Sequence, residues 1–207
     1  MMYADTDAGR VEATPGGRGT CPSCWGPTIA KCGSIVVHHW AHAAGDDCDT
    51  WSEPESPWHR RWKSYYAGCG ASVEVPMGTH RADVVTAGGG VVELQHSPIA
   101  LAEALEREHF YGRMLWLFDM TDEDRWSRVH FGRRGFWWKH GSKTQTRLRR
   151  PVFWHDPVGM VHRVSLSVVE TSTGSHRIVG RFLASYVEAD FLDLTQPRVR
   201  AHAGVTS

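Results

Sequence analysis

The sequence predicts a mixed α and β fold whose core runs in the order helix, three strands, helix, strand. Three observations predict it. Aromatic residues recur at helical spacing after Ser56-Pro57, a glycine triplet at 88–90 separates two valine-rich runs, and residues 114–118 form a continuous apolar run. Such a run is typical of a strand that is buried on both faces. With 207 residues, ten of them Trp, the chain is long enough to bury a core.

The first helix is predicted to begin at Ser56-Pro57, because Ser caps helices well and Pro suits the first helical position. Gly68-Cys69-Gly70 is expected to end it. The aromatic face of this helix consists of Trp58, Trp62, Tyr65 and Tyr66.

Three strands are expected over residues 71–76, 80–86 and 91–95, followed by a second helix over 99–112. The glycine triplet at 88–90 is typical of a hairpin connector, so the second and third strands should be antiparallel neighbours.

We divide the chain into an N-terminal hairpin with a Cys/His module over 1–50, the α/β core over 51–125, and a basic, aromatic segment with a β-rich extension over 126–207. No apolar run approaches the length of about 18 residues that a membrane-spanning helix needs, so no membrane partner is expected. The acidic N-terminus does not resemble a signal peptide, and we expect a cytoplasmic protein. Five Cys in that compartment favour metal binding or redox chemistry over disulfides.

Two acids face each other across the predicted glycine hairpin. Asp83 lies on one strand and Glu93 on the next, so their carboxylates should meet near one end of the sheet. Carboxylates that close repel unless a cation lies between them, and Mg²⁺ or Mn²⁺ prefers oxygen ligands. Such a metal polarises a phosphate and activates water. The alternative is a pair of ordinary solvated acids, which the surrounding valines disfavour.

Further residues surround this pair. Gln95 points to the same face as the second acid and can orient a water molecule or a phosphate oxygen by hydrogen bonding. Lys63 or His59, from the first helix, would supply a positive charge. Glu74 and Glu55 are additional candidate acids, although Glu74 is equally expected to be solvated and Glu55 to favour the helix N-terminus.

A second cluster lies near the N-terminus. Cys21-x-x-Cys24 presents two thiolates to one metal, and His39-x-x-His42 supplies two imidazoles, which together complete a tetrahedral structural Zn²⁺ site. The alternative is a set of free thiols with the His residues packed in the core. Three other residues remain open as substitute ligands: Cys32, His38 and Cys48.

Residues 131–150 hold seven Lys or Arg, no acid, and several aromatics. Because the formal net charge of the chain is zero, this local excess is the main charge signal for a polyanionic partner. Cations contact phosphates and exposed aromatics stack on bases, so we expect nucleic-acid contacts here, unless the Trp residues belong to the core. The expected contact residues are Arg133, Arg134, Lys139, Lys143, Arg147, Trp137 and Trp138.

Several motifs occur in a fixed order along residues 21–120. They are Cys21-x-x-Cys24, His39-x-x-His42, Glu55-Ser56-x-x-His59-x-x-x-Lys63, Arg81-Ala82-Asp83-Val84, Glu93-Leu94-Gln95-His96-Ser97 and Glu103-x-x-x-Arg107. This series resembles the competence protein CoiA-like family, a branch of the PD-(D/E)XK nucleases. The resemblance implies a restriction-endonuclease-like core, with Asp83 and Glu93 as metal ligands and Gln95 at the position where a Lys often occurs. A plain intrahelical ion pair is the alternative for Glu103 and Arg107.

The expected function is therefore that of a Mg²⁺-dependent deoxyribonuclease in recombination, competence or phage and defence processes, acting on DNA that includes single-stranded or branched forms. The main alternative is a catalytically weak or inactive zinc-containing nucleic-acid-binding module on the same scaffold, which Gln95 favours. A weaker alternative is a redox or zinc-regulated adaptor.

Overall fold

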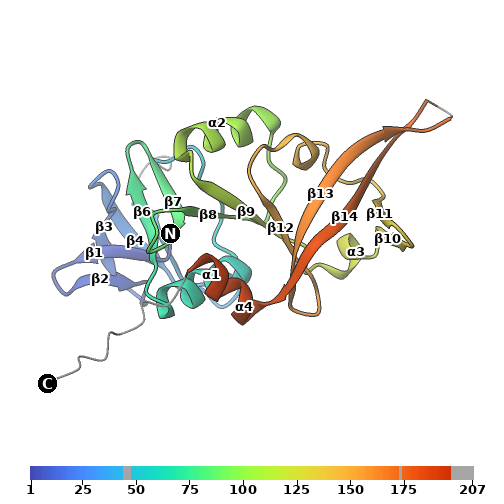
Figure 1. Ribbon diagram of the computed structural model, residues 1–207. Helices are drawn as coiled ribbons and strands as arrows, with labels where there is room; N and C mark the ends of the chain where they lie inside the picture. Colours follow the sequence, from blue (N-terminus) through green and yellow to red (C-terminus); the bar gives the residue numbers. More distant parts are fainter. Residues whose placement is uncertain (44–47, 173, 197–207) are drawn as a thin grey trace, which may run out of the picture.

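The computed structural model describes residues 1–43, 48–172 and 174–196, and it contains a five-stranded and a nine-stranded sheet (Figure 1). The mixed α and β architecture predicted from the sequence is confirmed. The predicted ranges 1–50 and 126–207 include positions 44–47, 173 and 197–207, which lie outside the described residues. Within the described part, no helix has the length and apolar character that a membrane crossing requires.

The small sheet is antiparallel throughout, in the order β2-β1-β3-β4-β5. Trp40 and Ala4 are buried in its own small core, and the Trp40 indole donates a hydrogen bond to the Val11 carbonyl. Its strands are β1 (Tyr3–Thr6), β2 (Gly9–Glu12), β3 (Arg18–Thr20), β4 (Pro27–Lys31) and β5 (His39–His42).

The first half of the large sheet follows the predicted order. Helix α1 (Pro57–Gly68) precedes β6 (Ser72–Met77), β7 (His80–Val85) and β8 (Val91–Gln95), and then come α2 (Leu101–Tyr111) and β9 (Met114–Asp119). Strands β6, β7 and β8 are antiparallel neighbours. Strands β8 and β9 are parallel, because the connection through α2 returns the chain to the same end of the sheet.

The first helix begins where the sequence predicts it. Ser56 is the N-cap, and its hydroxyl accepts a hydrogen bond from the His59 backbone N–H at 3.1 Å. This cap fixes the rotation of α1, so that Trp62 and Tyr66 face the core while His59 and Lys63 face the end of β7 and β8.

The C-terminal part of the chain continues the same sheet, whose full order is β10-β11-β14-β13-β12-β9-β8-β7-β6. Two short helices, α3 (Glu123–Trp126) and α4 (Glu188–Thr195), and a 3-10 helix at Gln145–Arg147 complete the described structure. The added strands are β10 (Val129–Gly132), β11 (Gly135–Trp138), β12 (Val152–His155), β13 (Met160–Glu170) and β14 (His176–Val187).

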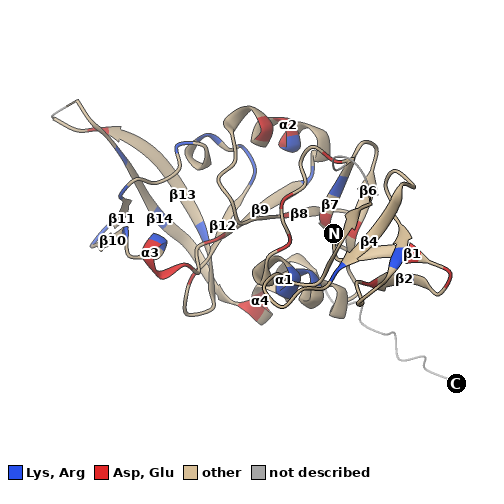
Figure 2. Ribbon diagram, turned by 180° about the vertical axis from the view of Figure 1, so that it is seen from behind, with Lys and Arg blue, Asp and Glu red and all other residues tan. Residues whose placement is uncertain are grey.

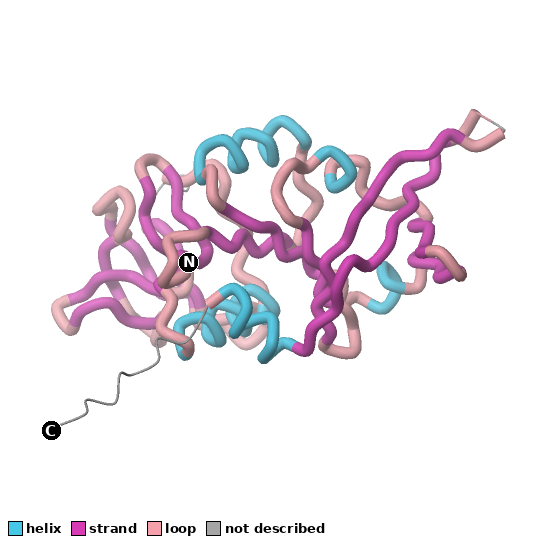
Figure 3. The backbone as a smooth tube through the Cα atoms, viewed as in Figure 1, coloured by secondary structure: helices cyan, strands magenta, loops and turns pink. Residues whose placement is uncertain are grey.

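Helices cover both faces of the central strands. Figure 3 shows α2 on one side of the sheet and α1 and α4 on the other. Trp116 and Trp154 belong to the buried cluster on the α2 side, and Trp62 and Phe191 to the cluster on the α1 and α4 side. The central strands are therefore buried on both faces, as the apolar run at 114–118 predicts.

Candidate functional site

Strands β7 and β8 separate at Asp83 and Glu93. Their pairing ends at Val84 opposite Val92. One position further on, the Asp83 carboxylate accepts the Leu94 backbone N–H at 3.0 Å, and the Glu93 carboxylate lies 3.4 Å from the Asp83 backbone nitrogen. Each acid thus replaces a bond that the strand ladder no longer makes. The predicted proximity of the two acids is present, and their catalytic role remains a prediction.

Lys63 forms ion pairs with three carboxylates. Its ammonium group lies 3.0 Å from Glu55, 3.1 Å from Glu74 and 3.3 Å from Asp83, and the side chain is almost fully buried. Burial alone would lower the pKa of Lys63, but the three negative charges, Glu74 first, raise it above its ordinary value. Lys63 is therefore a permanent cation at the centre of the predicted acids.

Glu74 occupies an unusual backbone position. Its φ of 50° lies in the left-handed region, which costs a non-glycine residue free energy and is often tolerated at functional sites. Its carboxylate accepts the backbone N–H groups of Met2 at 2.7 Å and Tyr3 at 3.0 Å. Burial would raise the pKa of Glu74, but the charges of Lys63 and Arg81 hold it well below its usual range. Glu74 therefore ties the pocket to the small sheet and is not solvated.

The two central acids have opposite electrostatic environments. Burial, and then the charge of Asp83, raise the pKa of Glu93 to about 7, although Arg107 pairs with Glu93 at 2.9 Å. Burial opposes ionisation of Asp83 as well, but Lys63 outweighs it and lowers the pKa of Asp83 below its ordinary value. The ion pair predicted within the helix, between Glu103 and Arg107, is also present. Arg107 therefore contacts both Glu103 and Glu93.

These residues line a small pocket of about 30 Å³, room for a water molecule or a metal ion. Figure 2 shows basic and acidic positions close together on β7, where Arg81 and Asp83 lie. One oxygen of Glu55 is buried and has no hydrogen-bond partner within the described chain. Negative charge exceeds positive charge in the lining, which contains Asp49, Glu53, Glu55, Glu74, Asp83 and Glu93 but only Lys63, Arg81 and Arg107 as cationic side chains.

Two further predicted residues support this pocket. The Gln95 side-chain amide donates to Glu53 and to the Ser97 carbonyl, so it positions an acid of the lining. The His59 ring lies between the Ser56 hydroxyl, at 2.9 Å, and the Leu94 carbonyl, at 2.9 Å. Sequence reasoning missed Glu53 and Asp49, because the irregular segment before α1 has no periodic pattern that shows where its side chains point.

Four residues of the small sheet and its connections form a second cluster. The ligand atoms of Cys21, Cys24, His42 and Cys48 all lie within 4.8 Å of one another. Despite some burial, hydrogen bonds from the Gly26 N–H and His42 lower the pKa of Cys24 to about 7, whereas burial raises the pKa of the Cys48 thiol to about 12. Three thiols and one imidazole in this arrangement suit a tetrahedral zinc ion with no open position.

The structure differs from the expected zinc ligands at one position. Cys48, which the sequence left open as a substitute, joins the cluster in place of His39. His39 and His42 are three positions apart on β5, and side chains of a strand alternate with period two, so the two rings leave opposite faces. The His39 Nδ1 atom lies 2.8 Å from the Val37 carbonyl oxygen instead.

Residues 16–50, which include all four cluster residues, match the family model for the competence protein CoiA, N-terminal domain. This segment is similar to the CoiA N-terminal domain. The resemblance to CoiA-like proteins seen in the sequence is thereby confirmed for this segment. No curated protein and no solved structure matches the chain.

The structure brings only some of the predicted contact residues of the basic stretch at 131–150 together. Trp138 is 6% exposed and packs in the core, so it is unavailable to stack on a base, which corrects the sequence prediction. Arg134 and Trp137 line an open groove on the outer strands. The remaining predicted residues are exposed but do not line that groove: Arg133, Lys139, Lys143 and Arg147.

Proposed function

We propose that the protein is a metal-dependent nuclease that hydrolyses phosphodiester bonds in DNA. The observation that carries the proposal is the meeting of Asp83 and Glu93 where β7 and β8 separate, in a pocket with more carboxylates than cations. A buried excess of negative charge is costly unless a cation joins it. The CoiA N-terminal domain supports a place for this activity in competence-related or recombination processes.

The oxygen donors fit Mg²⁺ or Mn²⁺. Asp83 and Glu93 would hold the ion, and the unpartnered oxygen of Glu55 is available nearby. The metal, when bound, polarises a phosphate oxygen and lowers the pKa of a water molecule. The pKa of Glu93 is raised in the pocket without a divalent ion, and binding of such an ion would favour its ionised form.

Lys63 supplies the positive charge that Gln95 does not. Because its pKa is raised, Lys63 stays protonated and stabilises negative charge on a phosphate; it does not accept a proton. Its contacts with Glu55 and Glu74 hold it in place beside Asp83. Gln95 acts through Glu53, whose carboxylate it fixes at the edge of the pocket.

A second candidate is a zinc-containing nucleic-acid-binding module without catalytic activity. The observation that favours it is the pairing of both central acids with cations of the chain, Asp83 with Lys63 and Glu93 with Arg107. These pairs reduce the need for a metal ion.

The two candidates are separated by a cleavage assay on linear, circular and single-stranded DNA, with and without Mg²⁺ or Mn²⁺. We expect metal-dependent cleavage by the wild type, and a loss of about 100-fold or more in Asp83→Asn and Glu93→Gln. Glu123→Gln, an exposed acid on α3, is the matched control and should cleave normally. Undiminished cleavage in both site variants would refute the assignment. Salt-sensitive binding without cleavage by the wild type would favour the second candidate.

A further inference from the structure

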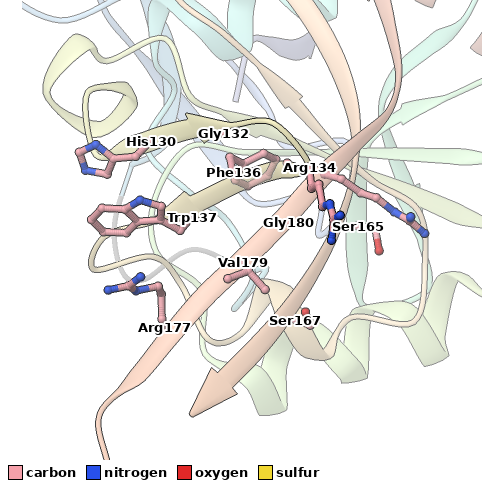
Figure 4. A pocket seen from close by; sticks show the side chains of 12 residues that line it. His130, Gly132, Arg134, Phe136, Trp137, Ser165, Ser167, Arg177, Val179 and Gly180 are labelled. Carbon is pink, nitrogen blue, oxygen red and sulfur yellow. The ribbon is translucent and has the colours of Figure 1, made fainter. Parts of the chain in front are cut away.

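An open groove of about 570 Å³ lies over β10, β11, β14 and β13 (Figure 4). Its floor is a cross-strand row, because His130 pairs with Trp137, Trp137 with Val179, and Val179 with Ser167. Residues that face each other across a ladder project to the same side of the sheet. Phe136, the chain neighbour of Trp137, is buried on the opposite side. The strand register therefore builds one continuous outer surface from four strands.

Three arginines surround this floor, and the described residues that line the groove include no acid. Arg134 comes from the turn between β10 and β11, and Arg177 and Arg181 lie four residues apart on β14. That spacing places both on one face of the strand, roughly 13 Å apart. All three are exposed, and Figure 2 shows basic positions gathered on β14 and the β10–β11 hairpin. The groove is complementary in charge to a chain of phosphates.

Trp137 lies between two other side chains of the groove. The His130 ring stacks on it with the centroids 4.0 Å apart, and the Arg177 guanidinium lies 4.7 Å from its centroid, with Trp137 between the two in Figure 4. The cation–π contact holds the guanidinium in a fixed orientation, which reduces the entropy cost of binding a phosphate. Because His130 and Arg177 cover the two faces of Trp137, the ring face that this stack offers to a base is the outer face of His130.

The part of the floor beside the hairpin has no side chains. Gly132 pairs with Gly135, and a Cβ atom on Gly135 would lie 2.3 Å from the Gly180 carbonyl oxygen. Gly135 also has a φ of 141°, which other residues rarely adopt. Glycine is therefore required here, and it leaves room for the backbone of a ligand to approach the sheet closely.

We propose that this groove binds a single strand of nucleic acid, with phosphates at Arg134, Arg177 and Arg181 and a base on the stack of His130 and Trp137. A positively charged groove with accessible aromatic rings suits unpaired bases, whereas a duplex exposes its base faces only at its ends. The inference rests on the proposed function in one respect, that the polymer bound here is also the polymer cleaved at Asp83 and Glu93.

The test measures binding of a fluorescent oligo(dT) of about 15 nucleotides, without divalent metal, across a range of salt. Three phosphate contacts predict a slope of log affinity against log salt of about −2, at roughly 0.7 per phosphate for a single strand. Arg177→Ala/Arg181→Ala should reduce the slope to about −0.7 and the affinity roughly twentyfold at 0.1 M salt. Arg18→Ala/Lys31→Ala makes the same change of charge at exposed positions of β3 and β4, outside the groove lining, and should stay within about twofold of the wild type.

Several results would overturn the inference: no binding by the wild type, equal losses in the two double variants, or duplex DNA of the same length binding as tightly as the single strand. The fluorescence of Trp137 gives a second measurement, since oligonucleotide should quench a signal that Trp137→Phe removes. Failure of the proposed nuclease is distinguishable, because it would abolish cleavage while leaving groove-dependent binding intact. If cleavage is lost in Asp83→Asn but binding is unchanged in the arginine double variant, this inference is wrong and the proposed function stands.

Discussion

At the scale of single residues, the carboxyl group of Glu93 couples folding to pH. Its pKa rises from the ordinary 4.5 to about 7, because burial and Asp83 disfavour the charged form. A carboxyl group with a raised pKa binds its proton more tightly in the folded state. Its contribution to stability is therefore complete below about pH 4.5 and is lost as the pH rises through about 7. Asp83 has the opposite sign, since its pKa is lowered and its contribution is lost as the pH falls.

Glu93→Gln should flatten the dependence of stability on pH in protein without added Mg²⁺ or Mn²⁺. Under these conditions, we expect the Tm of the wild type to fall between about pH 5 and pH 8 by more than that of the variant. Thermal unfolding at several pH values measures this. Glu103→Gln removes the other carboxylate that contacts Arg107 and controls for the loss of that contact. Parallel Tm profiles for wild type and Glu93→Gln would contradict the raised pKa.

Lys63→Met should be strongly destabilising. It leaves the carboxylates of Glu55, Glu74 and Asp83 buried without their shared cation, and breaking a buried ion pair from one side costs about 3–5 kcal/mol. Urea unfolding measures the change. Arg61→Ala on the same helix removes an ion pair with Glu188 that is nearly half exposed on the Arg side, and should cost less than about 1 kcal/mol. A similar small loss in both variants would show that Lys63 is not the centre of the acid cluster.

At the scale of secondary-structure elements, the small sheet depends on its Cys and His residues. The cluster joins the turn between β3 and β4 to the end of β5 and to Cys48 beyond it, so a metal ion would fasten three segments of a sheet with few buried apolar residues. Metal binding of this kind contributes directly to folding free energy. The match to the CoiA N-terminal domain covers the same segments.

We expect the purified protein to contain about one zinc ion per chain, and Cys24→Ser to lose it together with the fold of the small sheet. Cys32→Ser is the matched control, because Cys32 lies in the same module but outside the cluster. Elemental analysis and amide hydrogen exchange over residues 1–43 measure both effects. Wild-type protein free of zinc, or an equal zinc content in the two variants, would contradict a structural zinc site.

Elements with local signals were predictable from the sequence, and long-range placements were not. The cap at Ser56 and the glycine triplet at 88–90 act within a few residues, so α1 and the β7–β8 hairpin appear where expected. Whether Cys48 or His39 belongs to the metal-binding cluster depends on how the whole β4–β5 hairpin folds back. The arginines of β14 lie near Trp137 only because β11 pairs with β14, a strand about forty residues further along the chain.

At the scale of the whole molecule, the two sheets meet at Glu74. The backbone N–H groups of Met2 and Tyr3, at the start of β1, donate to its carboxylate, and the Arg10 guanidinium donates to the carbonyls of Val73 at 3.1 Å and Glu74 at 2.8 Å. The small sheet thus holds an acid of the pocket from two sides, and it stabilises the left-handed backbone of that acid. A strained residue persists when its surroundings fix it, so the small sheet and the acid pocket should be energetically coupled.

Arg10→Ala tests this coupling without touching either cluster. Loss of two hydrogen bonds to buried carbonyls should cost about 1–3 kcal/mol and loosen Glu74, while the zinc content stays unchanged. Urea unfolding measures the stability, and amide exchange at Met2 and Tyr3, whose N–H groups Glu74 accepts, measures the local effect. Arg18→Ala changes an exposed arginine on β3 and should alter neither. If exchange at Met2 and Tyr3 is equally slow in all three proteins, Arg10 does not hold Glu74 in place, and the ion pair with Lys63 is enough to orient the Glu74 carboxylate toward these two N–H groups.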